Sequence, residues 1–111
     1  MVEFDPAQFE DKYVNYFPQL QRAYKNAFNT MNDTYDSTLI HAIDQQVLNE
    51  SEPFYAPDRE GFDIELPDEP YSRLEGVVVD REQFDEVLAA YTAEIEAELC
   101  RTFQLGEEGK A

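Results

Sequence analysis

One helical stretch organises this chain: Lys12–Asn32, KYVNYFPQLQRAYKNAFNTMN. Around it, apolar residues recur from Phe9 to Tyr35 in steps of three or four, the period of one face of an amphipathic α-helix. Pro18 interrupts the pattern, because proline removes a backbone hydrogen bond and clashes with the preceding turn. Since the apolar face keeps its phase across Pro18, we expect a kinked helix or two nearly collinear helices, broken near Phe17. The face comprises Phe9, Tyr13, Phe17, Leu20, Tyr24, Phe28, Met31 and Tyr35.

The ends of this helical region carry recognisable signals. Asp5 followed by Pro6 is a helix start, with a capping carboxylate before a proline at the first helical position. The run Asn29–Ser37 is rich in residues whose side chains compete with the helix backbone, so a turn is expected there. Asp36 or Ser37 can cap a second helix that closes at 49–51. The inward residues of that helix are Leu39, Ile40, Ile43, Val47 and Leu48.

A C-terminal helix is expected over residues 81–104, followed by a polar tail at 106–111. Asp80 is its cap, and Gln83 stands at the spacing of a capping box. Cys100 is the sole cysteine, which excludes an intramolecular disulfide, and we expect it to be a small buried residue. The apolar face of this helix contains Phe84, Val87, Leu88, Tyr91, Ile95, Leu99 and Phe103.

Between the helical region 6–49 and the C-terminal helix lies a proline-rich loop and ribbon segment, residues 52–79. Alternating apolar residues predict a strand at 62–66, and a valine-rich run predicts a second strand at 74–79. A lone two-stranded ribbon is marginal in water, so it must lie against the helices. The sequence therefore predicts one domain, 1–111, of the mainly α (α+β) class, with three to four helices and a small two-stranded β-ribbon.

The composition points to an unusual solvent. The chain has 25 acidic and 8 basic residues and a net charge of −17, yet 42% of it is apolar and its Tyr and Phe content is too high for a disordered acidic tail. Concentrated salt screens the resulting self-repulsion, so a halophilic cytoplasm is the preferred interpretation. An acidic partner for a basic protein and a nucleic-acid mimic are the alternatives. No apolar run is long enough to span a membrane, so we expect a soluble cytoplasmic protein.

The stretch Lys12–Asn32 contains none of the 25 carboxylates. One interpretation is a central helix with little surface left for charge. A second is a contact surface for another copy or another protein, since interfaces are depleted in Asp and Glu. Two acidic copies repel least where acid is absent. The candidate contact residues are Asn15, Gln19, Arg22, Lys25, Asn26 and Asn29.

A third interpretation of the same stretch is a nucleic-acid groove. Arg22 and Lys25 would contact phosphates, while Tyr13, Tyr16 or Tyr24 stacks on bases. Binding of nucleic acid through the global charge is disfavoured, because phosphate contacts require Lys and Arg. This interpretation therefore ranks last.

Candidate chemistry is sparse. His41 and Asp44 are spaced to share a helix face and form a weak alternative ligand site or an acid–base pair. The acidic loop 58–69 could approach them, but it lacks the spacing of a calcium loop, so weakly bound cations are expected there. A metal site needs more ligands than one histidine provides. We therefore assign no catalytic residue, no metal and no cofactor, and we favour a protein without enzymatic activity.

The segments FDPAQFEDKYVNYFP, GFDIELPDEPYSR, GVVVDREQF and EIEAELCRTF resemble a family of short, acidic, uncharacterised proteins of halophilic archaea. The resemblance covers nearly the whole chain. It implies no activity and assigns no catalytic or binding residue, but it agrees with a halophilic cytoplasm. The leading hypothesis is a non-enzymatic protein that acts through protein–protein contact or homodimerisation.

Overall fold

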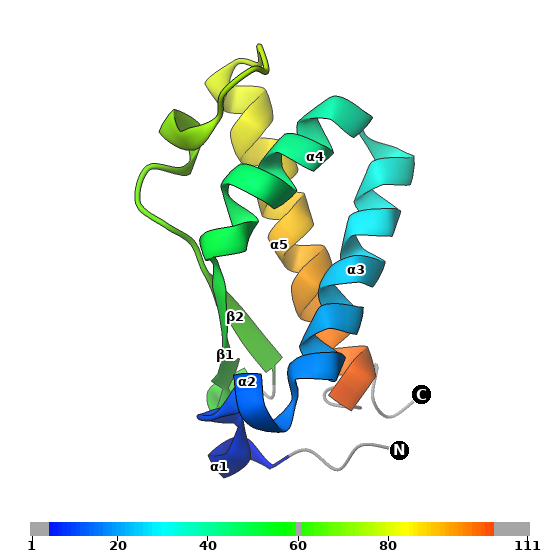
Figure 1. Cartoon of the computed structure of the whole chain (residues 1–111), viewed down its shortest axis with the longest axis vertical. Helices are drawn as coiled ribbons and strands as arrows, with labels where there is room; N and C mark the ends of the chain where they lie inside the picture. Colours follow the sequence, from blue (N-terminus) through cyan, green and yellow to red (C-terminus); the bar gives the residue numbers. More distant parts are fainter. Residues whose placement is uncertain (1–4, 60, 104–111) are drawn as a thin grey trace.

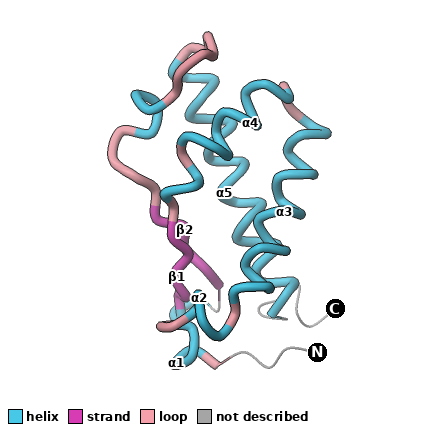
Figure 2. Tube along the Cα trace, in the orientation of Figure 1, coloured by secondary structure: helices cyan, strands magenta, loops and turns pink. Residues whose placement is uncertain are grey.

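Helices α3 (Phe17–Thr34), α4 (Ser37–Gln46) and α5 (Arg81–Phe103) pack around one core. A β-hairpin lies beside α5 toward the end of the molecule where the chain begins (Figure 1). This computed structural model describes residues 5–59 and 61–103. Its extents are 42 × 27 × 24 Å. Helix dominates the described residues (Figure 2), which confirms the expected mainly α (α+β) class.

The N-terminal segment is more broken than the sequence predicts. Short helices α1 (Pro6–Phe9) and α2 (Lys12–Asn15) precede α3 and lie off its axis, next to the hairpin (Figure 1). Asp5 caps α1 by accepting from the backbone N–H of Ala7 at 2.9 Å. The chain leaves helical geometry at Tyr16, where φ is −130°, and Pro18 occupies the first turn of α3. The break near Pro18 is confirmed, but the helices on either side are not collinear.

This break overturns the expected continuous apolar face. Tyr13 and Phe17 are 54% and 46% exposed, whereas Tyr16 is buried at 4%. The bend between α2 and α3 rotates Tyr16 inward, where its ring packs 5.0 Å from that of Phe103 at the end of α5. Phe9 also contacts Phe103, with ring centroids 6.0 Å apart. The start and the end of the described chain therefore meet in one aromatic cluster.

Helices α3 and α5 pack against each other more extensively than any other two elements of the described chain. Ala23 and Ala27 of α3 are completely buried, and their small side chains allow the two backbones to approach closely. The expected apolar face of α5 is confirmed, since all of its members are buried. The Asp80 cap is confirmed as well, because its carboxylate accepts from the Gln83 N–H at 2.7 Å. Cys100 is half-buried rather than buried.

Two helix ends differ from expectation. The turn expected over 29–37 is confined to Tyr35 and Asp36, because α3 continues to Thr34 with Met31 still in the core. Asp36 caps α4 by accepting from the Leu39 N–H at 3.2 Å. The short 3-10 helix η1 (Leu48–Glu50) then follows α4, and the expected inward residues of this region are all buried. Residue 104 and the tail 106–111 lie outside the described residues.

The ribbon pairs different segments from those predicted. Strand β1 (Glu52–Ala56) runs antiparallel to β2 (Gly61–Glu65), with Tyr55 opposite Phe62 and the 3-10 helix η2 (Pro57–Arg59) in the connection. The strand expected at 62–66 is therefore confirmed, with its ends one residue earlier. The strand expected at 74–79 is wrong, and its place is taken by a segment that Pro53 had marked as loop.

In the segment 74–79, backbone groups form hydrogen bonds with side chains instead of with a second strand. It follows the 3-10 helix η3 (Pro70–Arg73), and the Gln46 side chain both accepts from the Glu75 N–H at 2.6 Å and donates to the Glu75 carbonyl at 3.1 Å. The Tyr71 hydroxyl donates to the Val79 carbonyl at 2.6 Å. Gly76 has a φ of +79°, in the left-handed region, which interrupts an extended run. Side chains thus replace a neighbouring strand here.

Candidate functional site

The acid-free stretch presents a polar face to solvent. Asn15, Arg22, Lys25, Asn26 and Asn29 are exposed and Gln19 is half-buried; together we call these six residues the α3 surface. The interpretation of a helix with little surface left is therefore wrong, because α3 buries one face and exposes the other. Some of its amides already have partners: Asn15 donates to the Gln8 carbonyl at 2.9 Å and Asn26 to the Glu98 carboxylate at 3.3 Å.

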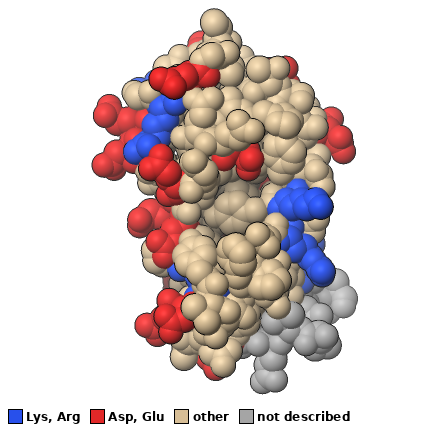
Figure 3. Space-filling view, viewed as in Figure 1, with Lys and Arg blue, Asp and Glu red and all other residues tan. Residues whose placement is uncertain are grey.

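Arg22 and Lys25 differ from the other basic side chains of the described chain. Neither makes an ion pair with any residue that the structure describes, whereas Lys12, Arg73, Arg81 and Arg101 each pair with a carboxylate. Figure 3 shows basic atoms on the α3 side of a largely uncharged face, with most acidic atoms at the opposite edge. The α3 surface is therefore a local positive region on a strongly negative molecule.

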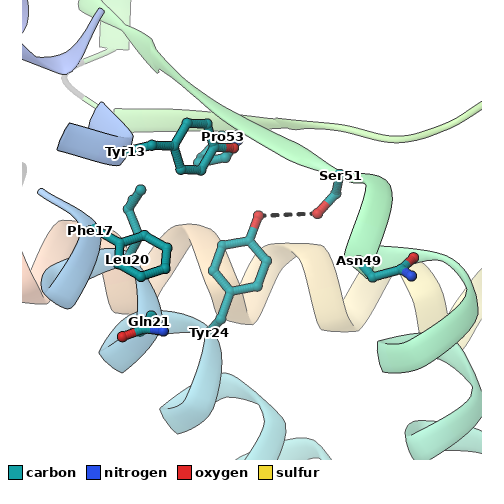
Figure 4. A pocket seen from close by; sticks show the side chains of 8 residues that line it. All are labelled: Tyr13, Phe17, Leu20, Gln21, Tyr24, Asn49, Ser51 and Pro53. Atoms are coloured by element: carbon teal, nitrogen blue, oxygen red, sulfur yellow. Dashed lines mark hydrogen bonds between the residues drawn. The ribbon is translucent and has the colours of Figure 1, made fainter. Parts of the chain in front are cut away.

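Next to this surface lies a hollow between α3, η1 and β1, with a volume of about 220 Å³. Its walls are aromatic and apolar, and its polar groups are amides and hydroxyls without formal charge. Figure 4 shows Tyr13 and Pro53 facing Leu20 and Tyr24 across it, with Gln21 and Asn49 further out. The lining residues are Tyr13, Phe17, Leu20, Gln21, Tyr24, Asn49, Ser51 and Pro53. This hollow suits an uncharged apolar group better than an ion.

Tyr24 forms the centre of the hollow. Its hydroxyl lies 3.1 Å from the Ser51 hydroxyl, and either oxygen can donate (Figure 4). Burial raises the pKa of the Tyr24 phenol to about 12, an effect that the Ser51 hydrogen bond only partly offsets. Tyr24 is therefore an uncharged hydrogen-bonding group at neutral pH. Of the residues proposed for base stacking, Tyr13 and Tyr24 line this hollow, whereas Tyr16 belongs to the core.

Lys12 is a feature that the sequence analysis missed. It is only 4% exposed, and its ammonium lies 2.7 Å from the Glu52 carboxylate of β1. The ammonium also lies 4.8 Å from the ring centroid of Phe54, 5.2 Å from that of Tyr13 and 5.4 Å from that of Phe9. The nearby aromatic residues Phe9 and Tyr13 were a signal in the sequence, but the ion-pair partner Glu52 on β1 is 40 positions away from Lys12. The ion pair joins α2 to the hairpin.

His41 and Asp44, the weak alternative site, both lie on α4 and are close enough to interact electrostatically. The exposed His41 ring stands edge-on to Phe28, with centroids 4.9 Å apart. Burial raises the pKa of the half-buried Asp44 carboxyl, while His41 and the Tyr91 hydroxyl lower it. Asp44 and Tyr91 interact electrostatically, but no hydrogen bond of normal distance and angle joins them. His41 therefore contacts Phe28 of α3, and Asp44 lies near Tyr91 of α5.

Asp58 and Asp63 of the acidic loop 58–69 do not join this pair. Asp58 and Asp63 belong to the hairpin, which lies toward the end of the molecule opposite α4 (Figure 1). Among the described residues, no group of three or more His, Cys, Asp or Glu side chains is arranged to hold a metal ion. Nor is any helix in that part of the chain both long and apolar enough to cross a membrane.

The comparisons with known proteins add one finding. No curated protein and no solved structure matches the chain significantly. A family match covers residues 1–106, which is nearly the whole sequence. The family has no assigned function, and this agrees with the expected resemblance to uncharacterised proteins. The chain belongs to the family of unknown function DUF5783.

Proposed function

We propose that this protein acts without catalysis, as a homodimer whose subunits meet at the α3 surface. The observation that carries the proposal is the pair Arg22 and Lys25, exposed bases with no ion pair to any described residue on a stretch without acid. Other basic side chains of the described chain, such as Arg73 and Arg81, form ion pairs with carboxylates of the same chain. Arg22 and Lys25 form none with the described residues, so they remain able to pair with carboxylates of another molecule. A second copy supplies carboxylates of the same kind.

Electrostatics favours this location for a contact. Two molecules of charge −17 repel each other over most approaches, and the repulsion is smallest where the approaching faces carry no acid. Interface cores also favour Arg, Tyr and Phe over Asp and Glu. The α3 surface combines Arg22 with the exposed rings of Tyr13 and Phe17 at its edge. These features together support a protein contact rather than a plain solvated helix face.

We further propose that the protein works in the salt-rich cytoplasm of a halophilic archaeon. The charge of −17 supports this proposal, because at about 1 M salt the screening length falls to about 3 Å and self-repulsion largely disappears. Weakly held cations near the acidic loop 58–69 would screen the remainder. The expected consequence is a dimer that forms readily in concentrated potassium chloride and dissociates in dilute buffer.

The test is the molar mass of the purified chain by light scattering during chromatography, in about 3 M and about 0.1 M potassium chloride, which bracket the screening regimes. A dimer is expected in high salt, and the double variant Arg22→Glu with Lys25→Glu should be a monomer there. A matched control adds the same charge at exposed positions elsewhere and should remain dimeric. Its substitutions are Gln45→Glu, Ser72→Glu, Ala89→Glu and Ala93→Glu.

The outcomes separate the alternatives. A monomeric wild-type chain at both salt concentrations would overturn the homodimer. A double variant that stays dimeric would overturn the α3 surface as the contact. Excess absorbance at 260 nm that travels with the wild-type chain and disappears in the double variant would overturn the dimer proposal in favour of nucleic-acid binding by Arg22 and Lys25.

A further inference from the structure

The loop Leu74–Asp80 holds an apolar side chain out into solvent. Val78 has a relative exposure of 104%, the highest among the large apolar side chains of the described chain. Its neighbours Val77 and Val79 are half-buried and pack against the core. The exposed side chain of Val78 therefore adds no hydrophobic stabilisation to its own chain, because apolar side chains stabilise a fold only where they are removed from water.

This loop is held in place rather than loose. Gln46 bonds both backbone groups of Glu75, and Tyr71 bonds the carbonyl of Val79. Between these two anchors, the backbones of Val77 and Val78 make no hydrogen bond to another residue of the described chain. The structure thus presents Val78 on a short segment that is fixed at both ends, which lowers the entropy lost when the segment binds a partner.

The hollow beside α3 is a suitable receptor for such a group. Phe17, Leu20 and Pro53 supply apolar walls, and its volume of about 220 Å³ exceeds what one valine side chain needs. The loop of the same chain does not fill it, because the loop lies near the start of α5 while the hollow lies near α2 and β1 (Figure 1). A second copy can bring its own Val78 to that place.

The charges of the loop and of α3 are also complementary when the loop of one copy enters the hollow of another. Gln21 lines the hollow, and on a helix of 3.6 residues per turn Lys25 lies one turn beyond Gln21 on the same side of α3. Glu75 and Asp80 flank Val78 in the loop, and both are exposed. A loop whose apolar centre enters the hollow therefore places a carboxylate near the ammonium of Lys25, which has no ion pair with any residue that the structure describes.

We infer that in the homodimer each subunit inserts Val78 into the hollow of the other, with Glu75 or Asp80 beside Lys25. The inference rests on the proposed homodimer and names the groups that join it. Because each copy carries both the protruding residue and the hollow, a two-fold arrangement satisfies both contacts at once and closes the assembly. A head-to-tail arrangement would instead leave one loop and one hollow unused at the ends of a growing chain.

The direct test is cross-linking between two variants, each with one cysteine. Val78→Cys and Asn49→Cys are made separately, both with Cys100→Ser, and mixed in high salt with a short bismaleimide reagent. Cross-linked dimers are expected in the mixture and not in either variant alone. The matched control replaces Val78→Cys by Ala93→Cys, which places the thiol at an exposed position of α5, outside the loop, the hollow and the α3 surface. The control should give no cross-link with Asn49→Cys.

A second measurement is the dissociation constant of the dimer by analytical ultracentrifugation. Val78→Asp should raise it by about tenfold or more, as expected for the loss of one buried valine and the burial of a charge. Ala93→Asp adds the same charge at an exposed position of α5 outside the proposed contacts and should leave the dissociation constant within about threefold, because a surface charge alone changes affinity little. Both variants should keep the wild-type circular dichroism spectrum, since neither side chain is part of the core.

Failure of this inference differs from failure of the proposed function. If the wild-type chain is a dimer but Val78→Cys and Asn49→Cys do not cross-link, the insertion of Val78 is wrong and the homodimer stands. Cross-linking of Val78→Cys with itself would overturn the insertion in favour of a contact between two loops. If the wild-type chain is a monomer throughout, both proposals are wrong.

Discussion

The ammonium of Lys12 and the carboxylate of Glu52 lie 2.7 Å apart, and they lie in very different solvent environments. The side chain of Lys12 is 5% exposed, whereas that of Glu52 is 42% exposed. The pair fixes α2 against β1, and the rings of Phe54 and Tyr13 cover the ammonium. Loss of the carboxylate leaves a buried charge without its counterion, while loss of the ammonium leaves a carboxylate that water can reach.

This asymmetry predicts unequal effects of the two substitutions. Glu52→Ala should lower the free energy of unfolding by about 2 kcal/mol, since the buried ammonium loses its charged hydrogen bond. Lys12→Met should change it by less than about 1 kcal/mol, because methionine fills the same aromatic surroundings without a charge. Urea unfolding measures both. Asp85→Ala, which breaks the exposed Arg81–Asp85 pair, is the control and should cost about 0.5 kcal/mol or less. Equal losses for Glu52→Ala and Asp85→Ala would contradict a buried role for Lys12.

The close approach of α3 and α5 predicts intolerance of larger side chains at its centre. Ala27→Leu should lower the free energy of unfolding by about 1–3 kcal/mol, because a completely buried position has no room for the added methyl groups. Ala89→Leu makes the same replacement at an exposed position of α5 and should be within about 0.5 kcal/mol of wild type. Thermal unfolding in high salt compares the two. A tolerated Ala27→Leu would mean that the helices lie further apart.

The raised pKa of Tyr24 predicts a loss of stability in alkali. The unfolded phenol ionises near its ordinary value of 10.0 and the folded one near 12, so between these values the native state binds more protons. Stability contributed by Tyr24 is therefore complete below pH 10 and falls as the pH rises toward 12, by up to about 1.4 kcal/mol per pH unit. Tyr24→Phe should flatten that decline. Urea unfolding at several values between pH 9 and 11 measures it, and parallel wild-type and variant curves would contradict it.

The raised pKa of Asp44 predicts a stabilising substitution. Burial disfavours its charged form, so above the ordinary value of 3.8 the native carboxyl holds its proton more tightly than the unfolded one. Its contribution is favourable below that value and is lost as the pH rises through the folded pKa. Asp44→Asn should therefore be more stable than wild type at pH 7, and the gain should shrink as the pH falls toward 3.8. Asp33→Asn removes the same charge from an exposed position of α3. If the two variants gained equally at pH 7, relief of net charge would explain the effect instead of burial.

The helices that the sequence predicted well carry their own local signals. The C-terminal helix was readable because Asp80 caps it and the spacing from Phe84 to Phe103 never changes phase. The prediction for the N-terminal half of the first apolar face was wrong, because the spacing of apolar residues does not show where a helix bends. Tyr16, two residues before Pro18, turns inward there and displaces both Tyr13 and Phe17.

The ribbon and the candidate site depend on contacts between distant residues, which a single sequence does not specify. The run 77–79 has high β-propensity, but propensity does not supply a partner strand. The backbone of the nearby Glu75 is instead hydrogen-bonded to the Gln46 side chain. Because of Pro53, the segment that forms β1 was predicted to be a loop, although an edge strand tolerates proline. The absence of acid from Lys12–Asn32 was visible at once. The burial of Lys12 at one end of that stretch was not, because its partner Glu52 comes from another element.

The contact of Phe103 with Phe9 and Tyr16 has a consequence for how the protein is made. A ribosome releases the chain from its N-terminus, so α1, α2 and the hairpin emerge long before the last turn of α5. Phe103 also lies 5.8 Å from the ring of Phe62 on β2, and without it this end of the core lacks one of its central aromatic side chains. A nascent chain that stops short of α5 therefore exposes Phe9, Tyr16 and Phe62 to solvent. This end of the core closes only after α5 has been synthesised, and until then its aromatic side chains are exposed to proteases and to aggregation.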